Sequence, residues 1–208
     1  NNWEKSVQGY LSSITFADHC VGQLLDALDK SEHAKNTILV LWGDHGWHLG
    51  EKEHWRKFAL WEEAARVPLM ISVPGTTQKG NRCERTVSLL DLYPTLVELC
   101  DLKKNESNEG RSIVPLLKNP TTTWEHPAVT TYRRNNHAVR SERWRYIRYA
   151  DGGEELYDHE NDPMEWKNLA KDSKYEQIKK QLKRHLPTKN APDAKRLPKQ
   201  KKKRKKKQ

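Results

Sequence analysis

TILVLWGDHG, residues 37–46, joins an unbroken apolar run to a turn that is flanked by two glycines. Residues 37–42 are apolar or β-branched without alternation, a pattern typical of a strand buried on both faces, as in a parallel sheet covered by helices. Ligands of open α/β sheets bind beyond the carboxyl ends of strands, and the glycines permit a close approach there. Asp44 and His45 are therefore well placed to bind a cation. The alternative is that this pair only caps the turn.

The segments on either side of this stretch predict an α/β layer architecture. Residues 4–30 predict a helix that covers the sheet, because apolar side chains recur every seventh residue at Val7, Ile14, Val21 and Leu28. A coiled coil would share this spacing, but the pattern stops and a buried-type strand follows. Residues 61–66 predict a helical turn, and residues 67–73 predict a second apolar strand. We therefore expect part of a mixed, mostly parallel sheet sandwiched by helices.

The second half of the chain predicts a small antiparallel sheet with one packing helix. Asp91 is suited to be the N-cap of a helix through Cys100, with Pro94 in its first turn. Short β-like segments follow at residues 128–132, 137–141, 144–149 and 155–157. The turn at residues 151–153, Asp-Gly-Gly, predicts a hairpin between the last two. The final helix, residues 174–186, should pack on this sheet through Tyr175, Ile178, Leu182 and Leu186.

These segments divide the 208 residues into three predicted parts. Residues 1–110 form part of an α/β core, and the polar, turn-rich stretch from 101 to 126 contains the boundary. Residues 111–187 form a small α+β subdomain, and residues 188–208 form a disordered basic tail. No internal repeat is present.

Positive charge is concentrated in that tail. The formal net charge is +10, and the ten basic residues between 195 and 207 account for all of it, which leaves 28 basic and 28 acidic residues in the body. The neutral body gives no indication of a specific nucleic-acid partner. The tail is most simply a solvated polycation that binds polyanions without specificity, by counterion release.

The cysteines leave the redox compartment undecided. Cys20, Cys83 and Cys100 lack metal-ligand spacing, and the sequence is compatible with one Cys83–Cys100 disulfide. No run of about 18 apolar residues is present, so we expect no membrane span. The chain starts at Asn1 without a signal peptide, so either a leader has been removed or the chain is a piece of a longer protein.

Three long motifs carry a resemblance to a known family. They are GDHGWHLGEKEHWRKFALWEEAARVPLMISVPG (43–75), VSLLDLYPTLVELC (87–100) and VRSERWRYIRYADGGEELYDHENDPMEWKNLA (139–170). Together they resemble the C-terminal half of a type I sulfatase, near the iduronate-2-sulfatase-like branch of the alkaline-phosphatase-like superfamily. The resemblance implies a sulfuric ester hydrolase of sulfated carbohydrate, such as a uronate-2-sulfate, and an exported protein.

The resemblance implies a role for three residues in the first motif. Asp44 and His45 match the family's ligands for Ca²⁺; a carboxylate suits this hard cation, whereas an imidazole is a softer ligand. Lys57 matches the lysine that contacts the sulfate group and its bridging oxygen, where an ammonium would stabilise the leaving alkoxide. Without the motif, Lys57 would be interpreted as a solvated surface lysine.

Two neighbours are weaker candidates for substrate binding. Trp47 either walls a sugar subsite by stacking or packs in the core. His48, like His54, is either a substrate contact or an ordinary surface histidine.

The chain departs from the family at the nucleophile. The family's formylglycine is made from the first residue of a C/S-x-P-x-R motif, and no such motif is present: no cysteine has a proline two residues later, and Thr76 replaces the arginine after Ser72. We therefore expect the nucleophile and the remaining metal ligands upstream, and no turnover by this chain alone. The alternatives are a phosphate-ester hydrolase of the same superfamily, a non-catalytic polyanion-binding module that uses the tail, and a truncated gene product without a function of its own.

Overall fold

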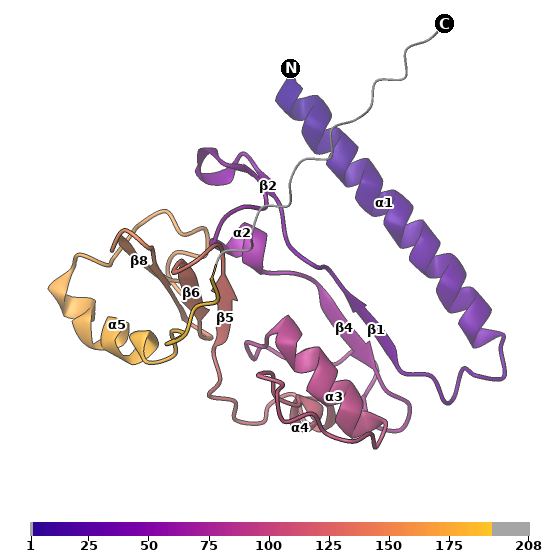
Figure 1. The fold of residues 1–208 in the computed structure, drawn as a ribbon. Helices are drawn as coiled ribbons and strands as arrows, with labels where there is room; N and C mark the ends of the chain where they lie inside the picture. Colours follow the sequence, from indigo (N-terminus) through magenta and orange to yellow (C-terminus); the bar gives the residue numbers. More distant parts are fainter. Residues whose placement is uncertain (1, 193–208) are drawn as a thin grey trace, which may run out of the picture.

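The computed structural model describes residues 2–192 and has a mixed α/β architecture (Figure 1). Residues 193–208, most of the predicted basic tail, lie outside the described part. The helices are α1 (Asn2–Asp29), α2 (Glu62–Ala65), α3 (Leu92–Leu99), α4 (Val114–Lys118) and α5 (Glu176–Lys183). Single 3₁₀ turns are η1 (Glu51–Glu53), η2 (Leu89–Asp91) and η3 (Ser173–Tyr175). The strands are β1 (Leu39–Trp42), β2 (His48–Leu49), β3 (Trp55–Arg56), β4 (Leu69–Ser72), β5 (Ala128–Thr131), β6 (His137–Arg140), β7 (Trp144–Arg148) and β8 (Glu154–Asp158).

The two strands predicted near the start of the chain are present as β1 and β4. They pair antiparallel, with Leu39 opposite Ser72 and Trp42 opposite Leu69. All strand pairs within residues 2–192 are antiparallel, so a mostly parallel sheet stays a prediction. Burial of β1 on both faces is not observed, since Trp42 is 50% exposed. An unbroken apolar run shows that a segment would be stable inside a core. The segment is buried only where a second layer of the structure packs against it.

The predicted first helix is present as α1, but it does not cover the sheet. None of its residues is buried. Its contacts lie near its N-terminus, where the indole of Trp3 donates a hydrogen bond of 2.7 Å to the carbonyl oxygen of Leu49 in β2. The amphipathic spacing predicted the helix correctly, but such spacing does not say which element lies against the apolar face.

The 3₁₀ turn η2, which precedes α3, begins with a capping box. The Ser88 hydroxyl accepts a hydrogen bond from the backbone N–H of Leu90, and the Asp91 carboxylate accepts one from the Ser88 N–H. Asp91 is the N-cap residue of α3 as predicted, but its side chain makes no cap hydrogen bond to α3 and is instead the reciprocal partner of Ser88 in the capping box of η2. The 3₁₀ turn η2 leads directly into α3.

Helix α4, within the stretch predicted to be irregular, packs on α3. The backbone N–H of Arg111 donates to Asp91 Oδ1 over 2.8 Å, and that of Ile113 donates to Thr95 Oγ1 over 3.0 Å. Ile113 is buried at the start of α4. These contacts join the chain on both sides of the predicted boundary at residue 110, and the division into subdomains stays a prediction.

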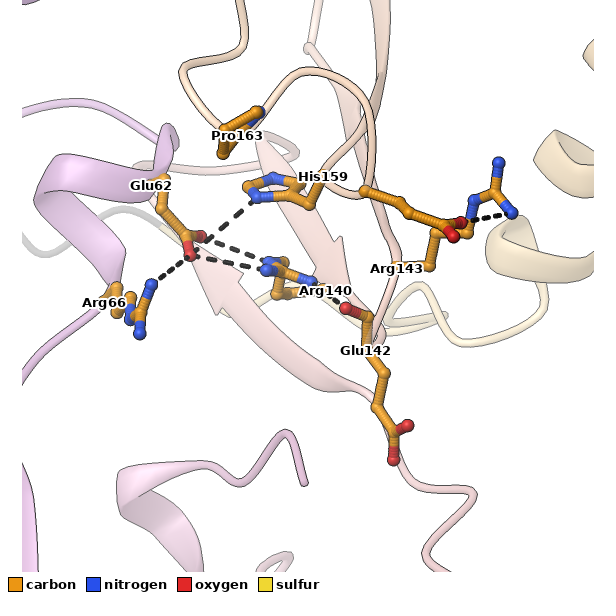
Figure 2. A pocket seen from close by; sticks show the side chains of 8 residues that line it. Glu62, Arg66, Arg140, Glu142, Arg143, His159 and Pro163 are labelled. Atoms are coloured by element: carbon orange, nitrogen blue, oxygen red, sulfur yellow. Dashed lines mark hydrogen bonds and ion pairs between the residues drawn. The ribbon is translucent and has the colours of Figure 1, made fainter. Parts of the chain in front are cut away.

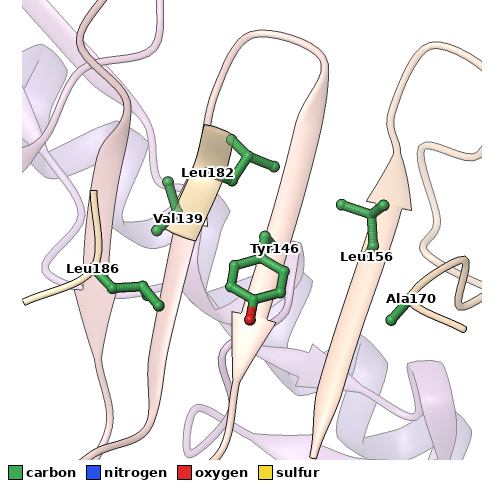
Figure 3. Close-up of a cluster of buried hydrophobic side chains, with 6 residues drawn as sticks. All are labelled: Val139, Tyr146, Leu156, Ala170, Leu182 and Leu186. Atoms are coloured by element: carbon green, nitrogen blue, oxygen red, sulfur yellow. The ribbon is translucent and has the colours of Figure 1, made fainter. Parts of the chain in front are cut away.

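The C-terminal sheet confirms the predicted meander, with strand order β5-β6-β7-β8. Its last hairpin turns at Asp151-Gly152-Gly153, where Gly152 has φ +89° and Gly153 N–H donates to the Asp151 carboxylate over 2.9 Å. Helix α5 packs on one face as predicted, through Ile178 and other apolar side chains. The buried cluster of this face, drawn in Figure 3, comprises Val139, Tyr146, Leu156, Ala170, Leu182 and Leu186.

The opposite face of this sheet is covered by the segment that precedes α2. Leu60 is buried against Ala138, Ile147 and Tyr157, with Trp61 packed beside them. The C-terminal sheet is thus covered on both sides, and the segment that follows Lys57 is part of its core.

The three cysteines are free and exposed, so the considered Cys83–Cys100 disulfide is wrong. Cys83 lies instead beside the carbonyl oxygen of Pro120, with a sulfur to oxygen distance of 3.4 Å. None of the helices in residues 2–192 is sufficiently long and apolar for a membrane crossing.

Candidate active site

The turn after β1 is fixed by backbone contacts to the segment around α2. Gly43 N–H donates to the carbonyl oxygen of Pro68 over 3.1 Å, and Gly46 N–H donates to that of Ala64 over 2.9 Å. A Cβ atom at Gly46 would overlap the carbonyl group of Glu63, so only glycine fits. The residues between the two glycines are therefore held at the end of β1.

Asp44, His45 and Lys57, the three residues predicted from the motif, lie together in the structure. Lys57 Nζ lies 2.7 Å from His45 Nε2, and His45 Nε2 lies 3.5 Å from Asp44 Oδ2. His45 Nδ1 lies 2.9 Å from the carbonyl oxygen of Gly46. Because a carbonyl only accepts, Nδ1 carries the proton, and the Nε2 lone pair accepts from the Lys57 ammonium. The Asp44 side chain is 83% exposed and points to solvent beside this pair.

The residue types of Asp44 and His45 fit a cation, since a carboxylate oxygen and an imidazole nitrogen converge there. In this structure the Nε2 lone pair accepts from the Lys57 ammonium, so His45 can bind a metal ion only after Lys57 has left it. Calcium takes about six to eight oxygen ligands, so these two side chains would supply a minority of its coordination shell. The remaining ligands would have to come from other groups.

A second group of ligand-type atoms lies deeper, at the pocket drawn in Figure 2. One atom each from Glu62, His159 and Glu165 lie within 4.8 Å of one another. Figure 2 draws Glu62 and His159. Arg145 fills this group: its Nε lies 2.5 Å from Glu165 Oε1, and its other end donates to Glu62. Arg140 Nε adds a contact of 3.1 Å to Glu62. Two guanidinium groups already neutralise these carboxylates, so the group is a buried ion network and does not favour a metal ion.

The pKa of Glu62 shows the strength of this network. Burial raises the pKa of Glu62, but Arg145 and Arg140 outweigh burial and hold it at about 2. Burial also opposes ionisation of Glu165, and the His159 hydrogen bond and the Arg145 charge still lower its pKa. Both carboxylates are therefore ionised at neutral pH. No local sequence pattern predicts this network, because Glu62 is far along the chain from its partners.

The loop that carries Lys57 is anchored to the C-terminal sheet by Lys52. Lys52 Nζ donates to Tyr157 Oη over 3.2 Å and to the carbonyl oxygen of Glu165. It also lies 4.9 Å from the ring centroid of Trp61 and 4.6 Å from that of Tyr157. These cation–π contacts and hydrogen bonds hold the loop in one place. Lys52 has φ +54°, a backbone conformation that these contacts maintain.

Trp47 lies beside the Asp44–His45–Lys57 group and is half-buried. Its ring stacks on Tyr10 of α1, with centroids 6.4 Å apart, and lies 6.3 Å from the imidazole of His45. The predicted sugar-stacking role stays a prediction, and the position beside His45 is compatible with it.

His48 is fully buried and faces away from solvent. Its Nδ1 lies 3.2 Å from the carbonyl oxygen of Arg56, the residue before Lys57, and its Nε2 lies 3.6 Å from Glu63 Oε2. Burial lowers the pKa of His48, so its ring is neutral at neutral pH. This arrangement supports the backbone under Lys57, and it leaves the predicted substrate contact by His48 untested.

The sequence is similar to those of known sulfatases. Residues 50–191 match the family model described as N-sulphoglucosamine sulphohydrolase, C-terminal. A sulfatase of Formosa agariphila is 44% identical over 189 residues, which cover 91% of this chain and 37% of the relative. A Delta 4,5-hexuronate-2-O-sulfatase of Bacteroides thetaiotaomicron is 34% identical, covering 76% of this chain and 35% of the relative.

Two solved structures have a fold similar to that of this chain. One is a protein solved in complex with its substrate, D-glucosamine-2-N,6-O-disulfate. It superposes on this chain with a TM-score of 0.72 at 28% identity, and the match covers 84% of this chain and 38% of the solved chain. A phosphonate monoester hydrolase of Agrobacterium radiobacter has a TM-score of 0.70 at 24% identity, covering 80% and 37%, and shares the fold.

Sequence and fold similarities point to the same class of protein, the sulfuric ester hydrolases of α/β fold. The chain belongs to the sulfatase family and matches its C-terminal region. It spans little more than a third of the length of the curated relatives named above.

Proposed function

We propose that this chain supplies one side of a sulfatase active site that acts on sulfated carbohydrate, such as a uronate-2-sulfate. The observation that carries the proposal is the 2.7 Å contact between Lys57 Nζ and His45 Nε2, with Asp44 beside it. The similarity to a hexuronate-2-O-sulfatase supports this choice of substrate. The family's exported location is part of the same proposal.

Lys57 would act directly on the sulfate ester. Its ammonium, half-buried beside a neutral imidazole, can donate to the bridging oxygen while the sulfur–oxygen bond breaks and negative charge develops on the leaving alkoxide. Asp44 and His45 would hold a divalent cation, Ca²⁺ in this proposal, once the Lys57 ammonium has left His45 Nε2 for the sulfate ester. The cation would supply neutralising charge to the sulfate oxygens. The protonated Nδ1 of His45 keeps Nε2 directed at this position through its bond to Gly46.

The nucleophile would come from another part of the protein. The 208 residues contain no C/S-x-P-x-R motif from which formylglycine could form. The exposed faces of α1 and β1 support this division, because apolar side chains such as Leu24 and Trp42 would be covered by the rest of an α/β core. The chain alone is therefore proposed to be inactive.

The test uses the complete protein that contains this chain. With a uronate-2-sulfate disaccharide as substrate, Lys57→Ala should reduce kcat about 10²–10³-fold, as expected for loss of one preorganised donor in the transition state. Lys167→Ala, at an exposed lysine outside the site, is the matched control and should retain full activity. An unchanged kcat in the Lys57→Ala variant would contradict the proposed catalytic role of Lys57.

A second candidate is hydrolysis of phosphate-type esters, because the phosphonate monoester hydrolase shares the fold. The same complete protein should be assayed with matched sulfate and phosphate esters in parallel. Faster turnover of the phosphate ester would favour this candidate. In the non-catalytic alternative the basic tail binds polyanions, so deletion of residues 195–208 should abolish binding. If the tail is not the function, this deletion should leave hydrolysis unaffected.

A further inference from the structure

A groove of about 460 Å³ lies between helix α1 and the β2–β3 hairpin, next to the candidate active site. Its volume is suited to one or two sugar rings. Three aromatic rings and one arginine are among the residues that line it, and none of its lining residues is acidic. The lining residues are Ser6, Gly9, Tyr10, Ser13, Trp47, Leu49, Trp55 and Arg56.

Two contacts hold the walls of this groove in place. The indole of Trp3 donates to the carbonyl oxygen of Leu49 over 2.7 Å, which ties the start of α1 to β2. Two turns further along the helix, Tyr10 stacks on Trp47 with an angle of 26° between the ring planes. Gly9 faces the space between these contacts without a side chain. The groove is therefore a formed feature of the described chain.

The lining has the chemistry that recognises a sugar ring. Trp55 is 41% exposed and, with Trp47, offers flat apolar faces to the C–H groups of a pyranose. On the α1 side, Ser6 and Ser13 donate their hydroxyl hydrogens to the carbonyl oxygens of Asn2 and Gly9. Their oxygen lone pairs therefore stay available to accept hydrogen bonds from sugar hydroxyls.

Arg56 adds an unpaired positive charge to the groove. Its side chain is exposed, and no carboxylate lies within ion-pair distance of it among residues 2–192. Its backbone has φ +74°, an unfavourable value for a non-glycine residue, and its carbonyl oxygen accepts from His48 Nδ1. The buried histidine thus holds Arg56 in a conformation that the free chain would rarely adopt.

The groove is continuous with the candidate active site through two residues. Trp47 contacts Tyr10 on the groove side and His45 on the other side. Arg56 ends β3 and directly precedes Lys57, so the groove and the candidate active site share one backbone segment. One ligand can therefore extend from Lys57 past Trp47 into the groove.

We propose that this groove binds a second, anionic sugar residue, adjacent to the sulfated sugar at Lys57, and that Arg56 pairs with the carboxylate or sulfate of this second sugar. The substrate would then be a sulfated oligosaccharide of at least two residues. The inference rests on the proposed function for the identity of the first sugar, but the aromatic and arginine lining stands independently of catalysis.

The test is a binding experiment, which does not need the nucleophile. The complete protein that contains this chain, with its nucleophile replaced by alanine, is titrated with a disaccharide of uronate-2-sulfate and N-sulfated hexosamine, and with the uronate-2-sulfate monosaccharide, following tryptophan fluorescence and calorimetric heat. The disaccharide should bind about tenfold more tightly than the monosaccharide, which corresponds to one good additional ion pair or stacking contact. Equal affinity for both ligands would overturn the inference.

Single substitutions test whether Trp55 and Arg56 bind the second sugar. Trp55→Ala and Arg56→Ala should each reduce the affinity for the disaccharide about tenfold and leave that for the monosaccharide unchanged. Arg56→Lys, which keeps the charge, should recover part of the loss. Trp42→Ala is the matched control, since Trp42 is exposed outside the groove, and it should have no effect. Both ligands should bind equally well after removal of residues 195–208, because the tail is not part of the groove.

The outcomes separate this inference from the proposed function. If the disaccharide has no advantage while hydrolysis by the complete protein still depends on Lys57, only the groove assignment is wrong. If the disaccharide advantage depends on Trp55 and Arg56 while hydrolysis does not depend on Lys57, the groove stands and the proposed catalytic role is wrong. Loss of the advantage in the Trp42→Ala control as well would assign the effect to general unfolding and would also overturn the groove assignment.

Discussion

The C-terminal sheet and the β1–β4 pair contain similar apolar residues but differ in burial. Leu156 of β8 is 0% exposed, whereas Trp42 of β1 is 50% exposed and Leu24 of α1 is 66% exposed. The C-terminal sheet has four strands, with α5 on one face and the segment around Leu60 on the other. Two strands alone form no core, because a sheet needs about three strands or a covering layer for independent stability. The difference shows that the layers around a strand, more than its apolar content, determine its burial.

Among the substitutions considered, loss of the Arg145 side chain should destabilise the C-terminal sheet most strongly. Arg145 is 1% exposed between Glu62 and Glu165, so Arg145→Ala would leave two buried carboxylates without their main partner. We expect a loss of about 3–5 kcal/mol in the free energy of unfolding, measured by urea denaturation. Arg66→Ala, at a side chain that is 78% exposed and also faces Glu62, should cost less than about 0.5 kcal/mol. Equal losses for the two variants would contradict the buried network.

Truncation of one leucine in each region should show the contrast directly. Leu156→Ala removes a fully buried side chain and should cost about 2–5 kcal/mol, through lost burial and a new cavity. Leu24→Ala, on exposed α1, should change stability by less than about 0.5 kcal/mol in the isolated chain. Amide hydrogen exchange should show slower exchange in β6, β7 and β8 than in α1. Similar costs at both positions would show that α1 is covered in solution.

Acid should unfold the C-terminal sheet selectively. Glu62 has its pKa held at about 2 in the folded state, below the ordinary value of 4.5. A carboxylate with a lowered folded-state pKa stabilises the fold fully above its unfolded value, and this contribution is lost as the pH falls from 4.5 towards 2. The free energy of unfolding should therefore fall steadily over this range. Glu62→Gln should be less stable at pH 7 and should show a shallower decrease; an unchanged slope would count against Glu62 as the responsible group.

The smallest expected effect is at the capping box of η2, which precedes α3, outside the C-terminal sheet. Ser88→Ala removes the hydroxyl that accepts from Leu90 N–H and should cost about 1 kcal/mol. Ser107→Ala, at an exposed turn, is the control and should cost less. If thermal melting of the two variants coincides, the capping box contributes nothing measurable, and α3 is held by its contacts with α4 alone.

Local patterns predicted most of the C-terminal sheet. The Asp-Gly-Gly turn at 151–153 and the spacing of Tyr175, Ile178 and Leu182 are signals contained within short segments, and both are confirmed. Helix α4 was not predicted, since it is five residues long, contains Pro115 and lies in a polar stretch. The position of Asp91 at the start of α3 was predicted correctly, but the capping box that it forms with Ser88 of the preceding turn was not.

The grouping of the candidate active-site residues was also predicted in part. The motif placed Asp44, His45 and Lys57 in one site, and the structure brings them together. The burial of His48 could not be predicted, since its neighbours in space, Glu63 and the Arg56 carbonyl, come from other elements. The ion network of Arg145 and Glu165 was also missed, because charged residues in sequence normally indicate surface.

The packing of Lys52 against the rings of Trp61 and Tyr157 limits how the sequence of this protein can change. The loop that carries Lys57 depends on a ring and a backbone carbonyl that lie more than a hundred positions later in the chain. A recombination event that joined residues 1–110 to the C-terminal sheet of a distant homologue would exchange this anchor and displace the loop. The two segments are therefore expected to be inherited together, with substitutions at Lys52 and Tyr157 correlated among descendants.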